Sequence, residues 1–149
     1  MKAKSVLPTT YLLIFLGLMI VLHLLVPARE IIKNSWKLLG LLPLAVGVTA
    51  NMMADAELHR AQTTVKPFLE SNALVVNGVY RYSRNPMYLG FVLILFGVAF
   101  LLGSISPFFV LPVFVVLIER LFIEAEEQML EVKFGQLWLD YKRRVRRWI

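Results

Sequence analysis

The chain has 149 residues, of which 58% are hydrophobic and 17% charged, with a formal net charge of +6 at neutral pH. A mean hydropathy of +0.69 is too high for an ordinary soluble domain, and the apolar residues fall in blocks that suit membrane spans. The absence of cysteine excludes disulfides, thiolate zinc sites and a cysteine nucleophile. We therefore expect a single membrane domain over residues 1–149.

The apolar blocks predict an all-α, multi-pass fold. Four transmembrane helices are expected at about residues 7–26, 36–54, 88–102 and 108–123. The third and fourth are short and joined by an uncharged turn at residues 103–107, which predicts a short or tilted helical hairpin. In the second, Gly40, Ala45, Gly47 and Ala50 would let a neighbouring helix approach closely.

The basic residues predict the orientation in the membrane. Of the 16 Lys and Arg residues, Arg29, Lys33 and Lys37 lie in or beside the first loop and none lies in the third, which leaves 16 − 3 = 13 elsewhere. Because cytoplasmic segments are enriched in Lys and Arg, both termini and the second loop are expected in the cytoplasm. The expected location is a prokaryotic inner membrane. The basic tail is expected to face anionic lipid headgroups rather than nucleic acid.

The tail, residues 124–149, is predicted to form amphipathic helices on the cytoplasmic face. Its larger apolar residues recur at helical spacing: Leu130, Phe134, Leu137, Tyr141, Val145 and Trp148. Gly135 interrupts the pattern and is predicted to separate two helices. The second helix is expected to lie on the membrane, with its aromatic side down and its arginines toward the headgroups.

The polar stretch at residues 74–90 is the first candidate for a site. It places Arg81, Arg84 and Asn85 directly before an apolar helix, where a structural connector has no evident need for them. Upstream, Asp55 and its neighbours Glu57 and His59 have no diagnostic ligand spacing, so a solvated helix end is favoured and no metal is expected.

Glu126 is the second candidate. On a helix its neighbours are all apolar: Phe122, Ile123, Met129 and Leu130. A carboxylate in such surroundings is costly unless something pairs with it, so a cation or a donor group is expected, either from the region of Arg81 and Arg84 or from a ligand. A structural ion pair and a ligand site remain equally open for Glu126. Glu119 shares the apolar surroundings and could pair with a basic residue in the same way.

Two motifs carry a resemblance to a known family. Residues 77–90, NGVYRYSRNPMYLG, resemble the G-x-Y-x-x-x-R-[HN]-P-x-Y-x-G motif of isoprenylcysteine carboxyl methyltransferases and related phospholipid methyltransferases. Residues 126–135, EEQMLEVKFG, followed by Tyr141 and Val145, resemble the tail motif of the same enzymes. The resemblance covers roughly residues 63–148 and is specific because both motifs occur in the right order.

The resemblance implies an integral membrane enzyme that transfers a methyl group from S-adenosylmethionine. The cofactor would lie between the helical hairpin and the C-terminal segment. The implied cofactor-binding residues are Asn72, Ala73, Leu74, Val75, Tyr80, Asn85, Pro86, Met87, Tyr88, Glu126 and Glu127. Arg84 is assigned a catalytic role, in which it orients an acidic acceptor group, or else pairs with Glu126.

Two departures from the prenylcysteine enzymes affect the acceptor. Asn85 stands where they carry histidine, and Phe122 stands where they carry an arginine that meets the substrate carboxylate. The expected acceptor is therefore stated more broadly as an amphiphilic or lipid-like molecule, prenylcysteine carboxylate-like or phospholipid amine-like, at the membrane–cytosol boundary. The alternatives are an NADPH-dependent membrane reductase of related architecture and a non-catalytic membrane scaffold.

Overall fold

The computed structural model describes residues 7–26, 29–63 and 73–149, and within these ranges the chain is helical, with no β-strand. The all-α prediction is therefore confirmed for the described residues. The elements are α1 (Pro8–Leu25), α2 (Asn34–Lys37), η1 (Leu38–Gly40), α3 (Leu41–Arg60), η2 (Gly78–Arg81), α4 (Pro86–Leu102), η3 (Ser106–Phe109), α5 (Val110–Ile118), the π-helical turn η4 (Glu119–Ile123), α6 (Glu124–Phe134) and α7 (Gln136–Arg144).

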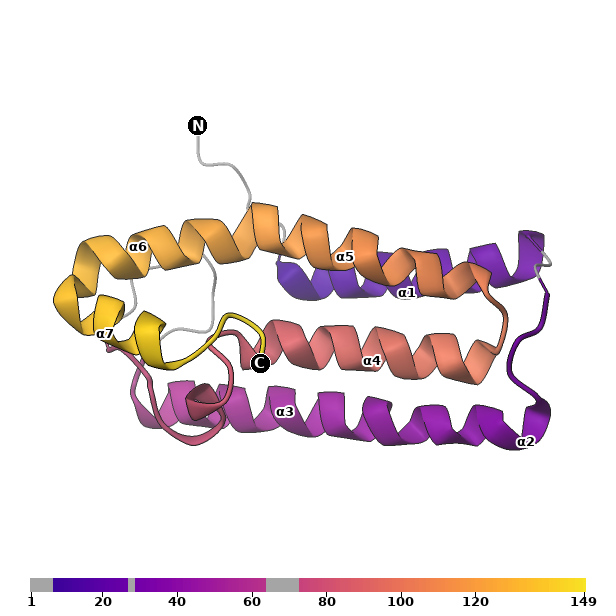
Figure 1. Ribbon diagram of the computed structural model, residues 1–149, viewed down its shortest axis with the longest axis horizontal. Coiled ribbons are helices and arrows are strands. Elements are labelled where there is room, and N and C mark those ends of the chain that lie inside the picture. The colour runs from indigo at the N-terminus through magenta and orange to yellow at the C-terminus, as the bar shows by residue number, and fades with distance from the viewer. Residues whose placement is uncertain (1–6, 27–28, 64–72) are drawn as a thin grey trace.

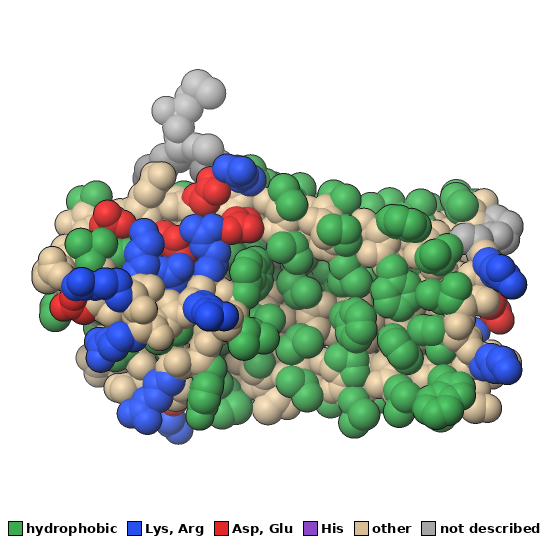
Figure 2. Space-filling model, viewed as in Figure 1, with side chains coloured by type: hydrophobic (Ala, Val, Ile, Leu, Met, Phe, Trp, Pro, Cys, Tyr) green, Lys and Arg blue, Asp and Glu red, His purple; other side chains and the backbone are tan. Residues whose placement is uncertain are grey.

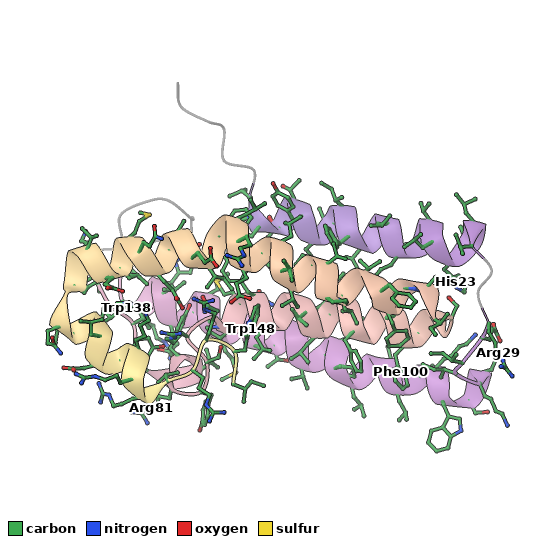
Figure 3. All side chains as sticks on the ribbon, turned by 45° about the horizontal axis from the view of Figure 1, so that its top comes forward. His23, Arg29, Arg81, Phe100, Trp138 and Trp148 are labelled. Atoms are coloured by element: carbon green, nitrogen blue, oxygen red, sulfur yellow. The ribbon has the colours of Figure 1, made fainter. Side chains whose placement is uncertain are left out.

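The helices α1, α3, α4 and α5 run lengthwise beside one another (Figure 1). The core lies between α1, α4 and α5 and includes Phe15, Met19, Leu95, Phe114 and Ile118. Helix α6 continues the line of α5 beyond the other helices, and α7 folds back beneath it. His23 and Arg29 lie at the end opposite to Arg81 and Trp138 (Figure 3). The first loop and the polar stretch are thus separated by the length of the bundle.

Two helical stretches, Pro8–Leu25 and Asn34–Arg60, are long and apolar enough to cross a membrane. The apolar helix α4 is shorter, with 17 residues. The second stretch continues past the predicted end at residue 54 because polar pairs support its last turns, among them Arg60 Nη1 bonded to Glu57 Oε1 at 3.1 Å. Hydrophobic side chains cover the middle and right of the visible face, while Lys and Arg gather over the end formed by α6 and α7 (Figure 2). These features suit membrane association.

Helices α3 and α4 approach most closely through glycines, as predicted for Gly40 and Gly47. A Cβ atom on Gly47 would lie 2.5 Å from the carbonyl oxygen of Gly90, and one on Gly40 would lie 2.5 Å from that of Gly97. Gly40 of η1 and Gly47 of α3 are spaced by seven residues, as are Gly90 and Gly97 of α4, and the two pairs face each other in antiparallel order. The backbones touch directly, so this pair of helices forms a tightly packed base for the residues that precede α4.

Two further glycines end helices as the sequence predicts. Gly103 follows α4 with a φ of +77°, a left-handed conformation that favours glycine, and opens the turn to η3. Gly135 separates α6 from α7 with a φ of +51°. The reversal at Gly135 returns α7 over the polar stretch, which brings the tail toward the start of α4.

Candidate active site

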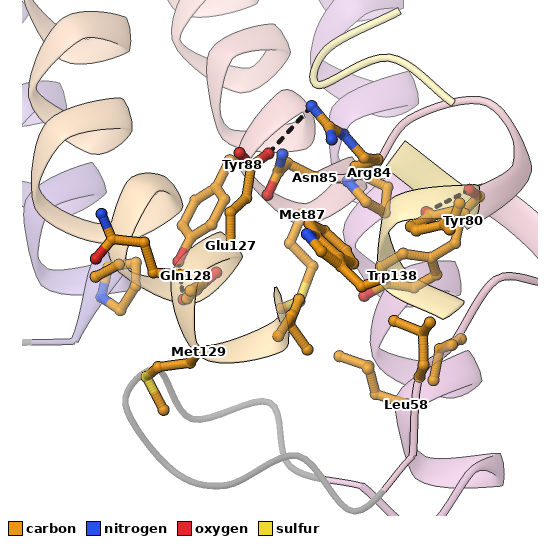
Figure 4. Close-up of a pocket in the computed structure, with 18 of the residues that line it drawn as sticks. Leu58, Tyr80, Arg84, Asn85, Met87, Tyr88, Glu127, Gln128, Met129 and Trp138 are labelled. Carbon is orange, nitrogen blue, oxygen red and sulfur yellow. Dashed lines mark hydrogen bonds and ion pairs between the residues drawn. The ribbon is translucent and has the colours of Figure 1, made fainter. Parts of the chain in front are cut away.

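A cavity of about 1040 Å³ lies at the end of the bundle where α6 and α7 meet the start of α4. Its wall comes from five parts of the chain: the start of α1, the end of α3, the stretch at residues 73–91, α6 and α7. Figure 4 shows Leu58, Met87 and Trp138 facing one another across this region. Segments far apart in the sequence therefore meet in one hollow.

The structure brings most of the sequence-predicted site residues to this one cavity. Lining it are Ala73, Leu74, Val75, Tyr80, Arg84, Asn85, Pro86, Met87, Tyr88, Glu126 and Glu127. Asn72 lies outside the described residues. The geometry places these side chains together, while their individual roles stay predictions.

The start of α4 forms one wall of the cavity. Pro86 occupies the first helical position, where its fixed φ suits a helix and its missing N–H costs nothing. The side chain of Asn85 does not cap the helix; its Nδ2 donates instead to the carbonyl of Arg147 at 3.1 Å. The first-turn N–H groups of α4 therefore receive no cap from Asn85.

Glu126 lies on the opposite wall and accepts a hydrogen bond from the hydroxyl of Tyr88, with 2.7 Å between the oxygens. The sequence predicted a cation or a donor group as its partner, and the partner in the structure is a donor group, the Tyr88 hydroxyl, while Arg84 pairs with Glu127. Burial raises the pKa of Glu126 to about 7, the bond from Tyr88 opposes that rise, and the charge of Glu127 adds to it. Among the described residues no cation pairs with this carboxylate, so a cationic ligand group would be stabilised here.

Glu127 is held quite differently, although it is the next residue. Its Oε1 lies 3.2 Å from Nη2 of Arg84, and its Oε2 lies 2.7 Å from Nη2 of Arg147. The same Arg147 also bonds Glu119, which confirms that Glu119 pairs with a basic residue. Because both oxygens of Glu127 are engaged by arginines, the geometry favours a structural role for Glu127 rather than cofactor binding.

The sequence predicted that the helix after Gly135 lies with its aromatic side on the membrane. In the structure this side of α7 packs against the protein instead. Trp138 and Tyr141 are both buried against the protein, and the hydroxyl of Tyr141 donates to the carbonyl of Tyr80 at 2.7 Å. The guanidinium carbon of Arg84 lies 5.7 Å from the centre of the Trp138 ring, a cation–π contact. The amphipathic pattern of the tail therefore marks the face that closes the cavity.

Burial also keeps the tyrosines of this wall neutral. Burial raises the pKa of Tyr80, with a smaller contribution from the charges of Tyr141 and Glu126, and burial raises that of Tyr141 to about 12. Both phenols therefore remain protonated at neutral pH, as the donation from the Tyr141 hydroxyl to the Tyr80 carbonyl requires of Tyr141.

Several lining residues were not predicted as site residues. Asp55 and Leu58 come from the end of α3, Leu7 and Pro8 from the start of α1, and Trp138 from α7. Asp55 was read as part of a solvated helix end, and nothing in its local sequence brings it to the cavity. For Trp138 a signal existed, because it lies three residues before Tyr141 and shares its helical face.

The comparisons with known proteins agree with this architecture. A family model described as phospholipid methyltransferase matches residues 36–137, which include α3, the polar stretch, α4, α5 and α6. An uncharacterised protein of Haemophilus influenzae is 38% identical over 63 residues, a match that covers 42% of this chain and 100% of that protein. The chain belongs to the phospholipid methyltransferase family, a family of methyltransferases that act on membrane lipid-like substrates.

Proposed function

We propose that this protein transfers a methyl group from S-adenosylmethionine to an amphiphilic or lipid-like acceptor at the membrane–cytosol boundary. The observation that carries the proposal is the Glu126 carboxylate. It is partly buried and lines a cavity of about 1040 Å³, is bonded to the Tyr88 hydroxyl and, in the described part of the chain, is not paired with a cation. In a methyltransferase family, a cationic cofactor is the natural occupant.

The residues of the cavity fit this cofactor. Its α-ammonium group would pair with Glu126, an interaction stronger than a neutral hydrogen bond. The uncapped first turn of α4 offers N–H groups to a carboxylate. The ring of Tyr80 offers an aromatic face for adenine or a sulfonium. Ligand sites commonly occupy about 300–1,000 Å³, so the cavity leaves room for an acceptor group beside the cofactor.

In this methyl transfer the protein mainly has to position the cofactor and the acceptor. S-adenosylmethionine, when bound, supplies an electrophilic methyl group for in-line displacement. Tyr88 fixes the Glu126 carboxylate by its 2.7 Å bond, so the negative charge is oriented before a ligand arrives. The apolar residues around it, among them Phe91 and Met129, exclude water from the reacting groups. No strong acid or base is required of the chain for this step.

The position that binds the substrate carboxylate in the prenylcysteine enzymes offers no cation here. Phe122, which replaces the carboxylate-binding arginine of the prenylcysteine enzymes, is buried. Arg120 is exposed and paired with Glu124 at 3.1 Å, and Arg84 is paired with Glu127. Arg120 is therefore engaged on the surface, whereas Arg84 pairs with Glu127 only through Nη2, and its Nε and Nη1 are buried with no hydrogen-bond partner among the described residues. The catalytic role predicted for Arg84 is compatible with these two nitrogens.

Membership of a methyltransferase family does not favour the two alternatives, a membrane reductase and a scaffold. A direct test uses the purified protein in detergent and isothermal titration with S-adenosylhomocysteine and NADPH. We expect S-adenosylhomocysteine to bind and NADPH not to bind; the reverse result would contradict the proposal. A radiolabelled methyl-transfer assay against a membrane lipid extract should then give a labelled lipid, and identifying that lipid would name the acceptor.

A further inference from the structure

Residues 145–149 form a strap that leaves α7 and returns to the start of α4 (Figure 1). Val145 turns the chain out of the helix with an extended backbone, φ −120° and ψ 131°. Trp148 then packs, partly buried, against the hydrophobic core. In Figure 3 Trp148 lies toward the middle of the molecule, away from Trp138. The strap is therefore anchored at both ends, by α7 and by the core.

The backbone of the strap binds the three residues that precede α4. The N–H of Arg84 donates to the carbonyl of Arg146 at 3.0 Å. The carbonyl of Arg147 accepts from the hydroxyl of Ser83 at 3.2 Å and from the side-chain amide of Asn85 at 3.1 Å. These bonds hold the entrance to α4 in place, at the wall where the cofactor is expected.

The side chain of Arg147 binds the opposite wall. Its Nε lies 3.2 Å from Oε1 of Glu127 and its Nη2 lies 2.7 Å from Oε2, a two-point contact with one carboxylate. Its Nη1 bonds Glu119. Thus a single residue joins the start of α4, through its carbonyl, to η4 and α6, through its guanidinium.

This arrangement bears on Glu126 because Glu126 and Glu127 are adjacent on α6. We propose that Arg147 is a positioning residue of the cofactor site: by clamping Glu127 and Asn85 together, it fixes the spacing between Glu126 and the start of α4. The inference rests on the proposed function, since it concerns the affinity of the same cavity for the cofactor. In this proposal Arg147 binds other residues of the protein, whereas the sequence predicted that the basic tail faces lipid headgroups.

Arg147 also has an electrostatic effect that a purely structural residue would lack. The titratable and charged groups around Glu126 are Tyr88, Tyr80, Glu127, Asp55, Arg84 and Lys133. The negative charge of Glu127 raises the pKa of Glu126, and Arg147 offsets that charge. Without Arg147, Glu127 would keep Arg84 as its remaining cation, so the pKa of Glu126 should rise further and cofactor binding should require a higher pH.

The test compares Arg147→Gln with Arg146→Gln in purified full-length protein. Arg146 has an exposed side chain, carries the same charge and, in the residues described, makes contact only through its backbone carbonyl, which the substitution retains. The dissociation constant of S-adenosylhomocysteine is measured between pH 6 and 8. We expect Arg147→Gln to weaken binding about tenfold at pH 7 and to move the pH midpoint upward, and Arg146→Gln to do neither.

A double-mutant cycle with Glu127→Gln separates the clamp from other effects of Arg147. If the two side chains act as a unit, the double variant should lose no more affinity than the worse single variant. Should Arg147→Gln fail to fold, Arg147→Lys keeps the charge but not the two-point contact and should still weaken binding by several-fold.

The outcomes distinguish this inference from the proposed function. If the wild-type protein does not bind S-adenosylhomocysteine at all, the proposed function fails. If the wild type binds and Arg147→Gln, or Arg147→Lys in its place, matches Arg146→Gln in affinity and in pH midpoint, the cofactor site stands and Arg147 has no positioning role.

Discussion

At the scale of single residues, the site depends on two adjacent glutamates in opposite situations. Glu127 is enclosed by the guanidinium groups of Arg84 and Arg147. Glu126 has the Tyr88 hydroxyl and a raised pKa of about 7. A carboxylate that is buried and left with a neutral partner is costly to the fold, and such costs commonly mark ligand sites. This contrast supports the proposal that Glu126 binds a ligand and that Glu127 supports the site.

The raised pKa of Glu126 gives cofactor binding a pH dependence. Below pH 7 the carboxyl is protonated and cannot pair with an ammonium group, so affinity for S-adenosylhomocysteine should fall as the pH drops through about 7. Glu126→Gln should weaken binding about ten- to hundredfold at pH 8 and remove the pH dependence. Calorimetric titration measures both effects. Glu124→Gln, on the surface of the same helix, is the control and should bind like the wild type.

The raised pKa of Glu126 also determines whether its ionisation stabilises or destabilises the folded protein. Folding raises the pKa of Glu126 from 4.5 to about 7, so the folded state holds the proton more tightly than the unfolded state. This contribution is present at low pH and is lost as the pH rises through 7. Glu126→Gln should therefore be at least as stable as the wild type at pH 8, measured by thermal unfolding in detergent. A large loss of stability would instead make Glu126 a structural residue.

Tyr88→Phe tests the partner of Glu126. The hydroxyl of Tyr88 lowers the pKa of Glu126 through its hydrogen bond, so its removal should raise that pKa above about 7. The pH midpoint of S-adenosylhomocysteine binding should then shift upward, with weaker binding at pH 7. Tyr82→Phe, at an exposed tyrosine of the same stretch, should leave the midpoint unchanged. Equal midpoints in the two variants would show that the bond has no part in binding.

The sequence motifs predicted residues that line one cavity in the structure, but they did not predict which of these residues pair with one another. The motifs around Tyr88 and Glu126 predicted two walls of one site, and both line it. Arg84 pairs with Glu127 rather than with Glu126. Which of these two adjacent residues faces Arg84 depends on how α6 is rotated about its own axis. Such a rotation leaves no trace in composition or spacing, which is why the sequence left the partner of Arg84 open.

At the scale of elements, the π-helical turn Glu119–Ile123 explains this rotation. In a regular α-helix, residues seven apart lie close to one face, so Glu119 would align with Glu126. A π turn accommodates an extra residue, and the alignment moves to Glu127, which shares Arg147 with Glu119. Glu126 is thereby left to face Tyr88. The ends of α1 and α4 were predictable from apolar blocks and Gly103, whereas the end of α3 and the π turn were not.

The glycine contacts between α3 and α4 give an element-scale prediction. A Cβ on Gly47 would lie 2.5 Å from the Gly90 carbonyl oxygen, so Gly47→Ala must push the helices apart. We expect a loss of about 1–3 kcal/mol, as in other overpacked interfaces, seen as a lower thermal midpoint. Gly17→Ala, on α1 with no atom within 4 Å of the new Cβ, is the control and should be neutral or slightly stabilising. If both variants unfold alike, close packing is not the reason for the glycine.

At the scale of the whole molecule, the two ends of the bundle differ in charge. Lys and Arg gather over the end with α6 and α7, and fewer lie at the end that carries Arg29 (Figure 2, Figure 3). This asymmetry is the basis of the prediction that both termini and the candidate site face the cytoplasm. Two helical stretches are long enough to span a membrane, and the crossing of four spans stays a prediction.

Because the chain contains no cysteine, single introduced cysteines can test this topology. Lys33→Cys lies in the first loop and Arg143→Cys on α7, both at exposed positions. A membrane-impermeant maleimide should label Lys33→Cys in intact cells and Arg143→Cys only after the membrane is opened. Labelling of Arg143→Cys in intact cells would place the tail, and with it the cavity, on the outer side.

The position of the strap along the chain has a consequence for biogenesis. Every helix that lines the cavity precedes residues 145–149, so α1 through α7 leave the ribosome before Arg147 does. Until then Glu119 and Glu127 lack the guanidinium that joins them, and Glu127 has Arg84 as its arginine partner. Membrane insertion and completion of the site are therefore separate events. If Arg147 positions the cofactor site as we propose, a nascent chain becomes able to bind the cofactor only after residues 145–149 have been synthesised.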